Sequence, residues 1–429
     1  MFQRTHPPKL ASPIEVDGRR IAIPTKVQYK WHDMEIGTFI HFAPNTWQDS
    51  EGDTLKTPLS ELNPERLDTD QWARAAKAMG AKYLVFVAKH QGGFCWWQTD
   101  TTDYSVKNTP WKGGKGDVMK DVSASCKKHG LGLGVYLSPR DDYHGANVGG
   151  RAKDPAKQAD YERLYRRQLT ELLSNYGDMM EVWFDGSLVF DVGDILEKHA
   201  PNAVIFQGPQ ATIRWVGNED GYAPYPAWNS VRSGAKKWGD YTAADGDPDG
   251  DRWLPNECDA RIRNTWFWRT DNEKTLKSLD ALMEMYYRSV GHGAVFLLNH
   301  TPDPTGLIPE ADFKRGEEMG NEIKRLFSIP LATKQGARTD ETLLLRGKTP
   351  IGHIVLMEEI ARGERVRRYA LEARVNGQWQ TIAEGSAIGH KRIHRFENLE
   401  ADAVRVRLVE TLSDPMLRLI QAHPFLPKR

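Results

Sequence analysis

The stretch EVWFDG, residues 181–186, decides the fold that we predict for this chain. Its apolar residues read as a buried β-strand that runs up to the carboxylate of Asp185, after which Gly186 interrupts the run. In a parallel sheet surrounded by helices, the carboxyl ends of the strands face the ligand, so Asp185 is a candidate for chemistry. Trp183 points to the same face as Asp185 because side chains alternate along a strand. From this stretch alone, a catalytic aspartate and an aspartate that caps the next turn are equally good interpretations.

Strands and helices alternate on both sides of this stretch, over about 330 residues. The predicted strands are 38–42, 83–88, 131–137, 182–185, 203–206 and 294–298, and the predicted helices are 68–79, 118–129, 155–176, 192–199, 273–289 and 310–327. This order is typical of a parallel sheet. We therefore predict an α/β fold with a (β/α)8-like, TIM-type barrel over residues 1–330, distorted because only six or seven strands are evident.

The last 95 residues, 335–429, have a different pattern. Short apolar runs are separated by turns, with no helix between them, at 343–345, 353–357, 369–375, 379–383, 392–396, 404–408 and 417–420. This pattern predicts a C-terminal all-β sandwich domain. Tyr369, Trp379 and His390 could bind carbohydrate, but the tract shows no cluster of aromatic residues. We therefore expect the sandwich to pack on the barrel.

The composition argues against several classes of function. The 58 basic and 58 acidic residues cancel, so neither nucleic acid nor an anionic membrane is an expected partner. Cys95, Cys126 and Cys258 show no zinc-binding spacing and no glycine-rich phosphate loop occurs, so we expect no metal and no cofactor. The N-terminus does not read as a signal peptide. We expect a periplasmic or secreted protein whose signal is absent from this chain, with a cytoplasmic location as the alternative.

Polar residues gather where the predicted strands end. They comprise His41, 89–91, 136–141, Asp185, 214–219, 257–259 and 299–300. A single histidine at a strand end is usually structural, but several polar groups at one rim indicate a site. Two carboxylates with aromatic residues between them suit glycoside hydrolysis, with Asp185 as the nucleophile and Glu219 or Glu257 as the acid. A metal site made by His41, His90 and Asp185 is the weaker alternative because no metal-binding spacing supports it.

Eight segments carry a resemblance to a known family. They are GTFIHF (37–42), AKHQGGFCW (88–96), YLSP (136–139), WFDG (183–186), RWVGNE (214–219), PNECD (255–259), WF (266–267) and LLN (297–299). In this combination and order, the chain resembles the α-L-fucosidases of glycoside hydrolase family 29. The RWVGNE and ECD segments are similar to the subfamily that prefers fucose linked α-1,3 or α-1,4 on branched oligosaccharides. A trailing β-sandwich is also usual in that family.

The resemblance implies a retaining mechanism with Asp185 as the nucleophile and Glu219 as the acid/base. The separation of these two residues, 219 − 185 = 34, is shorter than the subfamily pattern, so Glu257 stays the second candidate for the acid. The implied substrate-binding residues are His41, Glu51, His90, Gln91, Tyr136, Trp183, Arg214, Glu257 and Phe267, the last beside the C5 methyl group of the sugar. We expect Arg214 to keep Asp185 ionised, and burial or the charge of Asp185 to raise the pKa of Glu219.

Four positions depart from the family pattern. Gln91 and Gly92 stand where the family usually has His and Asp, Arg140 stands where it has a rim Trp, and Gly52 follows Glu51 where a Glu-Trp pair is usual. These departures bear on which sugar is bound rather than on the type of reaction. We predict an exo-α-L-fucosidase whose partner is a fucosylated oligosaccharide or glycoconjugate. The alternatives are the same chemistry on a related L-sugar such as α-L-galactose, and a carbohydrate-binding protein without turnover.

Overall fold

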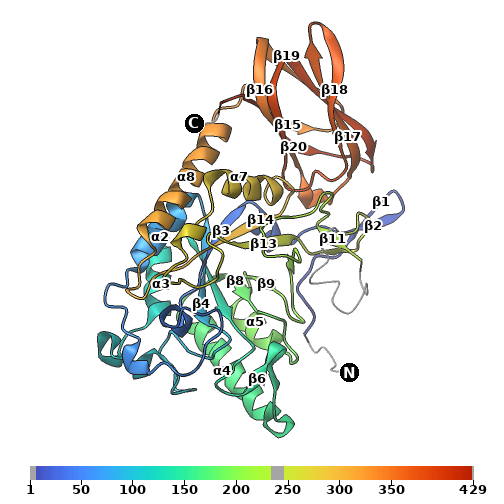
Figure 1. Cartoon of the computed structure of the whole chain (residues 1–429). Coiled ribbons are helices and arrows are strands. Elements are labelled where there is room, and N and C mark those ends of the chain that lie inside the picture. The colour runs from blue at the N-terminus through green and yellow to red at the C-terminus, as the bar shows by residue number, and fades with distance from the viewer. Residues whose placement is uncertain (1–5, 233–245, 428–429) are drawn as a thin grey trace.

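The computed structural model describes residues 6–232 and 246–427, which form a barrel followed by a domain of antiparallel strands (Figure 1). The ends of the two predicted domains, residues 1–5 and 428–429, lie outside this description. The barrel strands are β3 (Ile36–Ile40), β4 (Tyr83–Lys89), β5 (Gly132–Leu137), β8 (Met179–Trp183), β9 (Val204–Phe206), β10 (Arg214–Trp215), β13 (Asn256–Arg261) and β14 (Val295–His300).

These eight strands form one parallel sheet in the order β10-β13-β14-β3-β4-β5-β8-β9. A parallel bridge between Phe206 and Ile213 joins its two edges, so neighbouring strands follow one another around the barrel in chain order. The predicted (β/α)8-like barrel is confirmed. Its sixth strand in chain order, β10, has only two residues.

Helices cover the outside of the barrel, as Figure 1 shows. They are α1 (Lys26–His32), α2 (Thr69–Met79), α3 (Val118–His129), α4 (Gln158–Asn175), α5 (Gly193–His199), α7 (Leu279–Arg288) and α8 (Glu310–Phe327). Local signals fix their ends: Asp68 caps α2 by accepting a hydrogen bond from a backbone N–H, and Gly80 ends it in the left-handed conformation. Among the described residues, the structure contains no helix that is both long and apolar enough for a membrane span.

The interior of the barrel is filled by alternate residues of its strands. These residues form an apolar cluster inside the barrel that includes Phe39, Val85, Val87 and Val295. A larger apolar cluster lies between the strands and the surrounding helices. Each fully buried side chain of this kind contributes about 1.5–3 kcal/mol to folding. Because side chains close the interior, a ligand can reach the barrel only at its ends.

The C-terminal domain is an antiparallel sheet with its own core. Its strands are β15 (Ala332–Ala337), β16 (Glu341–Glu358), β17 (Val366–Val375), β18 (Gln378–Gly385), β19 (Arg392–Thr411) and β20 (Leu417–Pro424). The predicted runs 343–345 and 353–357 are the two halves of β16, and 392–396 and 404–408 belong to β19. Register shifts break the pairing of these two long strands, and the sheet folds over its core there. The predicted all-β domain is thus present.

This domain packs on the barrel. His390 Nε2 donates a hydrogen bond to the carboxylate of Glu35 at 3.0 Å, and the ring of His353 stacks on Tyr287 of α7. Tyr369 and His390, which the sequence offers as carbohydrate ligands, are each 1% exposed and so are not available to a glycan. Short hairpins complete the fold: β1 (Ile14–Val16) with β2 (Arg19–Ile21), β6 (Ala146–Asn147) with β7 (Arg151–Ala152), and β11 (Ser230–Val231) with β12 (Arg252–Trp253).

Candidate active site

A pocket of about 240 Å³ opens at the carboxyl ends of the barrel strands. It is lined by Phe39, His41, Glu51, His90, Gln91, Tyr136, Trp183, Asp185, Glu219, Asp259 and Trp266. Eight of the eleven predicted site residues therefore meet in one cavity, including both predicted catalytic carboxylates. The volume lies just below the range of about 300–1,000 Å³ that is usual for drug-sized ligands, so it suits a ligand as small as one sugar ring.

A tight turn after β8 holds Asp185 at the pocket. Gly186 has φ 74°, and a side chain there would meet Val148 at 2.5 Å, so the turn requires glycine. The side-chain oxygen of Gln207 accepts hydrogen bonds from the backbone N–H groups of Gly186 at 2.9 Å and Ser187 at 3.2 Å. The backbone that follows Asp185 is therefore held in place.

Two donors bind one oxygen of Asp185. Gln91 Nε2 donates to Oδ2 at 2.7 Å, and the Tyr136 hydroxyl donates to the same atom at 2.9 Å. Hydrogen bonds to a carboxylate stabilise its ionised form. Because both bonds go to Oδ2, the other oxygen, Oδ1, is the one that these two donors leave for a ligand.

Glu219 reaches the pocket from the loop after β10. Its Oε2 accepts a hydrogen bond from Trp266 Nε1 at 3.1 Å and lies 3.6 Å from the guanidinium of Arg261. The side chain is 44% exposed. The predicted partial burial of Glu219 is therefore not found, because its loop stands at the rim rather than inside the barrel.

The two pocket histidines are neutral. Burial lowers the pKa of His41 to about 3, and burial with the charge of Arg140 lowers the pKa of His90 to about 3. Asn299 Nδ2 donates to the carbonyl of Trp266, so its Oδ1 faces His41 and accepts from Nδ1–H at 2.7 Å. His41 then carries its proton on Nδ1 and presents Nε2 as a hydrogen-bond acceptor.

A bulge in β4 turns His90 toward the pocket. The pairing of β4 with β5 shifts between Val87 and Lys89. Val87 lies in the barrel interior, whereas Lys89 contacts Gln168 of α4 outside the barrel. A bulge re-aims the side chains that follow it, and this one places His90 and Gln91 at the pocket.

Glu257 is the first predicted site residue that the structure places elsewhere. Its carboxylate lies inside the barrel, 0% exposed, where it accepts hydrogen bonds from Tyr83 at 3.1 Å and Trp183 at 2.8 Å. Burial and the neighbouring Glu181 raise its pKa well above the usual range. The structure therefore does not support the prediction that Glu257 binds substrate or acts as the acid. Glu257 and Asp259 point to the same face of β13, but only Asp259 lies far enough along the barrel to line the pocket.

Arg214 is the second predicted site residue that the structure places outside the pocket. It is fully buried, and its guanidinium donates to the backbone carbonyls of Trp228, Asn229 and Leu254. Its neighbour Trp215 faces the barrel instead and donates to Asp259 at 2.7 Å. Adjacent residues of a strand point to opposite faces, so β10 turns Arg214 away from Asp185 and the expected ionic contact is not made.

Phe267 is the third predicted site residue that the structure places outside the pocket. It is 0% exposed and lies behind the pocket, with its ring edge-on to His41 at 5.4 Å and to His90 at 4.9 Å. The neighbouring Trp266 lines the cavity in its place and lies 4.9 Å from the His41 ring. The sequence pair Trp266-Phe267 was recognised, but only the structure shows which of the two rings reaches the ligand space.

Asp259 is a pocket residue that the sequence reasoning did not assign to substrate. It is 3% exposed, and burial together with the charge of Glu257 raises its pKa well above the usual range. Period-two alternation from Glu257 could have identified it. Phe39 of β3 was missed likewise and adds an apolar wall.

The metal-site alternative gains no support from the geometry. Within residues 6–232 and 246–427, no group of three or more His, Cys, Asp or Glu side chains is arranged to hold a metal ion. The Nδ1 atom of His41 is occupied by Asn299, and Asp185 is held by Gln91 and Tyr136.

Comparison with known proteins gives the same family as the sequence motifs. The family model described as alpha-L-fucosidase matches residues 27–325. The chain belongs to the alpha-L-fucosidase family. Alpha-L-fucosidase 1 of Arabidopsis thaliana is 33% identical over a region that covers 92% of this chain and 86% of the plant protein.

Solved structures of glycoside hydrolase family 29 agree over the full length of this fucosidase-family chain. A family member from an unknown rumen bacterium has a TM-score of 0.86 and 32% identity, covering 98% of this chain and 79% of its own. A Ruminococcus gnavus family 29 fucosidase in complex with fucose has a TM-score of 0.84 and 27% identity, covering 98% and 97%. The chain is therefore a glycoside hydrolase of the alpha-L-fucosidase type, and the enzyme class expected from the sequence is confirmed.

One departure from the fucosidase pattern has a structural explanation. Gly92 stands where the family usually has Asp, and a Cβ atom on it would lie 2.3 Å from Oδ2 of Asp53. Asp53 comes from the loop after β3 and accepts hydrogen bonds from Tyr104 at 2.6 Å and Gln48 at 2.9 Å. A carboxylate from another loop thus fills the space beside residue 92, and that residue has to be glycine.

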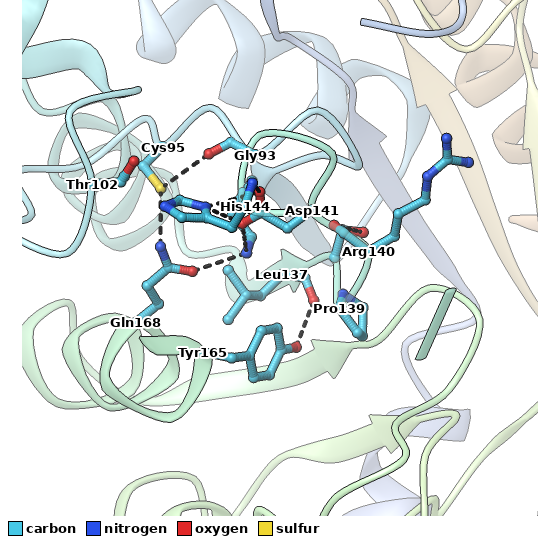
Figure 2. A network of polar contacts seen from close by, with 12 residues as sticks. Gly93, Cys95, Thr102, Leu137, Pro139, Arg140, Asp141, His144, Tyr165 and Gln168 are labelled. Atoms are coloured by element: carbon cyan, nitrogen blue, oxygen red, sulfur yellow. Dashed lines mark hydrogen bonds and ion pairs between the residues drawn. The ribbon is translucent and has the colours of Figure 1, made fainter. Parts of the chain in front are cut away.

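A buried ion pair supports the loop beside the fucosidase pocket (Figure 2). Lys89 Nζ donates to Asp141 at 3.0 Å and to Gln168 at 2.9 Å, and both charged side chains are 0% exposed. His144 closes the other side of Asp141 with its ring and its backbone N–H, each at 3.0 Å. Burial alone would raise the pKa of Asp141, but Lys89 and His144 lower it to about 2.

Replacement of Lys89 by methionine should be strongly destabilising. It would leave the charge of Asp141 buried without its cation, and breaking a buried pair from one side costs about 3–5 kcal/mol. Lys314→Met is the matched control, because Lys314 forms an exposed i,i+4 pair with Glu310 that is worth about 0.3–0.5 kcal/mol. Chemical denaturation measures the free energy of unfolding of both variants. Equal losses for the two variants would show that the buried pair does not support the barrel.

The same pair should give the protein an acid-sensitive contribution to stability. The folded pKa of Asp141, about 2, is below its ordinary value, so ionised Asp141 stabilises the fold above about pH 4. This contribution is lost as the pH falls from about 4 toward 2. In Asp141→Asn the unfolding free energy should depend less on pH over that window. An unchanged pH dependence would show that the ionisation of Asp141 does not contribute to stability in this range.

Proposed function

We propose that this enzyme is a retaining exo-α-L-fucosidase that removes terminal α-linked L-fucose. The observation that carries the proposal is that Asp185 and Glu219 line one small pocket at the carboxyl ends of the strands. The pocket is closed below by the packed barrel interior, which suits a chain end rather than the middle of a glycan. Two carboxylates that flank one sugar are the machinery of most glycosidases, and in a retaining enzyme one of them is the nucleophile.

In the first step, Oδ1 of Asp185 attacks the anomeric carbon while Glu219 gives its proton to the glycosidic oxygen. The carbon–oxygen bond to the aglycone breaks, an ester bond to Asp185 forms, and the aglycone leaves as an alcohol. In the second step, Glu219 takes a proton from water, whose oxygen displaces Asp185. Two inversions at the same carbon retain its configuration. Exposure of Glu219 at the rim suits this role, because the aglycone has to leave past it.

The walls of the pocket support a pyranose ligand. Phe39, Trp183 and Trp266 offer apolar surface, and Trp183 stacks on Phe206 with 3.8 Å between ring centroids, which keeps its plane fixed. Neutral His41 can accept a hydrogen bond from a sugar hydroxyl through Nε2. Such a combination of flat apolar walls and few polar groups is usual for small-molecule sites.

We propose further that the enzyme prefers α-1,3- or α-1,4-linked fucose on branched oligosaccharides. The RWVGNE and ECD segments, which resemble the subfamily with this preference, supply Glu219 and Asp259 to the rim and wall of the pocket. A panel of defined fucosylated oligosaccharides tests the linkage. Cleavage of α-1,2-linked fucose in preference to the branched α-1,3 and α-1,4 isomers would contradict it.

The reaction is tested with aryl α-L-fucoside and aryl α-L-galactoside. We expect the fucoside to be cleaved with the larger kcat/KM, and proton NMR to show the α-anomer of fucose as the first product. Preference for the galactoside would assign the enzyme to the related L-sugar, for which Gln91 and Arg140 are the first residues to consider. Binding of fucose with no cleavage of either substrate would make the protein a carbohydrate binder. The β-anomer as the first product would overturn the retaining mechanism.

A further inference from the structure

A chain of polar contacts leads from the surface to the carboxylate of Asp185. Arg140 donates to both oxygens of Asp142, through Nε at 3.1 Å and through Nη2 at 3.0 Å. The same guanidinium donates from Nη1 to Gln91 Oε1 at 3.2 Å. Gln91 Nε2 in turn donates to Asp185 Oδ2 at 2.7 Å. Each contact in the series has a defined donor and a defined acceptor.

The orientation of the Gln91 amide decides whether it helps or opposes Asp185. An amide has a donating end and an accepting end of nearly the same shape, so its orientation is set by its neighbours. A guanidinium only donates. Arg140 therefore binds the Oε1 end, and the NH₂ end is directed at Asp185. With the amide reversed, Oε1 would face the carboxylate and repel it.

We propose that Arg140 is a positioning residue that acts on Asp185 through Gln91. The inference rests on the proposed role of Asp185 as nucleophile. A guanidinium has donors only, so it can bind only the oxygen end of the Gln91 amide. A fixed donor at Asp185 Oδ2 stabilises the carboxylate that has to attack and that has to leave again in the second step.

The fold holds Arg140 and Gln91 in register. The backbone N–H of Asp142 donates to the carbonyl of Gln91 at 2.9 Å, and the N–H of Tyr143 donates to the carbonyl of Gly92 at 3.2 Å. Ser138 Oγ also donates to the carbonyl of Arg140 at 2.9 Å. The loop that carries Arg140 is thus attached to the segment that carries Gln91.

The buried ion pair anchors the same loop from its other side. Asp141 turns toward Lys89, whereas the side chain of Arg140 extends away from that network (Figure 2). Consecutive residues of one loop therefore serve two purposes, one in the interior and one at the pocket. Removal of the Arg140 side chain leaves the Lys89–Asp141 contact in place.

Gln91 and Arg140 are both departures from the fucosidase pattern described above, and the structure joins them directly. Histidine, the usual residue at position 91, can select the tautomer that donates to a carboxylate. A glutamine has no such freedom and needs a partner at its oxygen. Arginine at position 140 supplies that partner, so the two exchanges form a matched pair.

A double-mutant cycle tests the proposal with Gln91→Ala, Arg140→Met and the combined variant, assayed on aryl α-L-fucoside. We expect Gln91→Ala to lower kcat/KM about tenfold, the effect of one hydrogen bond to a charged group. Arg140→Met should lower it about three- to tenfold, and the double variant should equal Gln91→Ala. Arg163→Met is the control, since Arg163 is an exposed residue of α4 that pairs with Asp160. Additive losses would overturn the proposal.

The pH profile separates positioning from a general structural effect. The groups that share the pocket with Asp185 are His41, Glu51, His90, Tyr136, Glu219 and Asp259. Gln91→Glu puts an acceptor in place of the donor, so the acidic limb of kcat/KM should move up by about one pH unit. An unmoved limb would contradict the proposed contact.

Two further variants keep the test decisive. If Arg140→Met lowers the melting temperature, Arg140→Lys replaces it in the cycle, because an ammonium keeps the charge but cannot serve Asp142 and Gln91 in the fork geometry of arginine. Full activity of Arg140→Lys would overturn the positioning role. If Asp185→Asn stays active, the proposed nucleophile is wrong; if it is inactive and the cycle is additive, only the role of Arg140 is wrong.

Discussion

Asp185→Asn is expected to lower kcat on aryl α-L-fucoside by about 10⁴-fold or more, the size of effect seen when an essential catalytic group is removed. Asparagine keeps the shape of the side chain and can still accept from Gln91 and Tyr136, but its amide cannot form the glycosyl ester. The fold should be unaffected, because the Gly186 turn is held by Gln207 rather than by the carboxylate.

Two measurements sharpen this test. Asp178→Asn is the matched control, since Asp178 is exposed just before the opposite end of β8, and its kcat should stay within about twofold. Asp185→Gly leaves room for azide, which should restore turnover and yield a fucosyl azide of inverted configuration. Residual activity in Asp185→Asn above about one percent of wild type would argue that another group attacks the sugar.

Glu219→Ala should separate substrates by their leaving groups. An oligosaccharide leaves as a poor alkoxide and needs a proton, so its kcat/KM should fall by about 10²–10⁴. A dinitrophenyl fucoside needs no proton, and its kcat/KM should change by less than about tenfold. Steady-state kinetics on both substrates give the ratio of the two losses in kcat/KM. This ratio separates the acid role from any change in binding.

Asp259→Asn is the comparison for Glu219→Ala, because Asp259 is another carboxyl group that lines the same pocket, where it accepts a hydrogen bond from Trp215. We expect Asp259→Asn to affect both substrates equally, as loss of a binding contact would. A leaving-group dependence in Asp259→Asn and none in Glu219→Ala would transfer the acid role to Asp259. The same pattern in Glu257→Ala would contradict the placement of Glu257 inside the barrel.

The regular elements could be predicted because their signals are local. Helices 118–129 and 310–327 were predicted with the bounds that the structure shows for α3 and α8. Their apolar periodicity and their capping or terminating residues are properties of a few consecutive residues. Strands β10 and β13 were missed, since the first has two residues and the second reads NECDAR, without the apolar alternation of a typical strand.

The errors at the site come from the direction in which a side chain points and from its depth along the barrel. Sequence similarity identified the segments RWVGNE and PNECD correctly as part of the site, but not which of their side chains face the pocket. Neighbouring strand residues point to opposite faces, so a shift of one position separates Trp215 from Arg214 and places Arg214 among backbone carbonyls. Glu257 and Asp259 point to the same face of β13, and here it is depth along the barrel that separates them, because only Asp259 lines the pocket.

The sequence by itself determined the fold class and the family and predicted two carboxylates, Asp185 and Glu219, that meet in one pocket, because periodicity, capping and short motifs are written in consecutive residues. Only the tertiary structure decided which groups share the cavity and what they touch. The bulge in β4, the link from Arg140 to Gln91 and the carboxylate of Asp53 beside Gly92 all join residues distant in the chain. Such contacts depend on how strands and loops are placed in space, and no local pattern of residues encodes that placement.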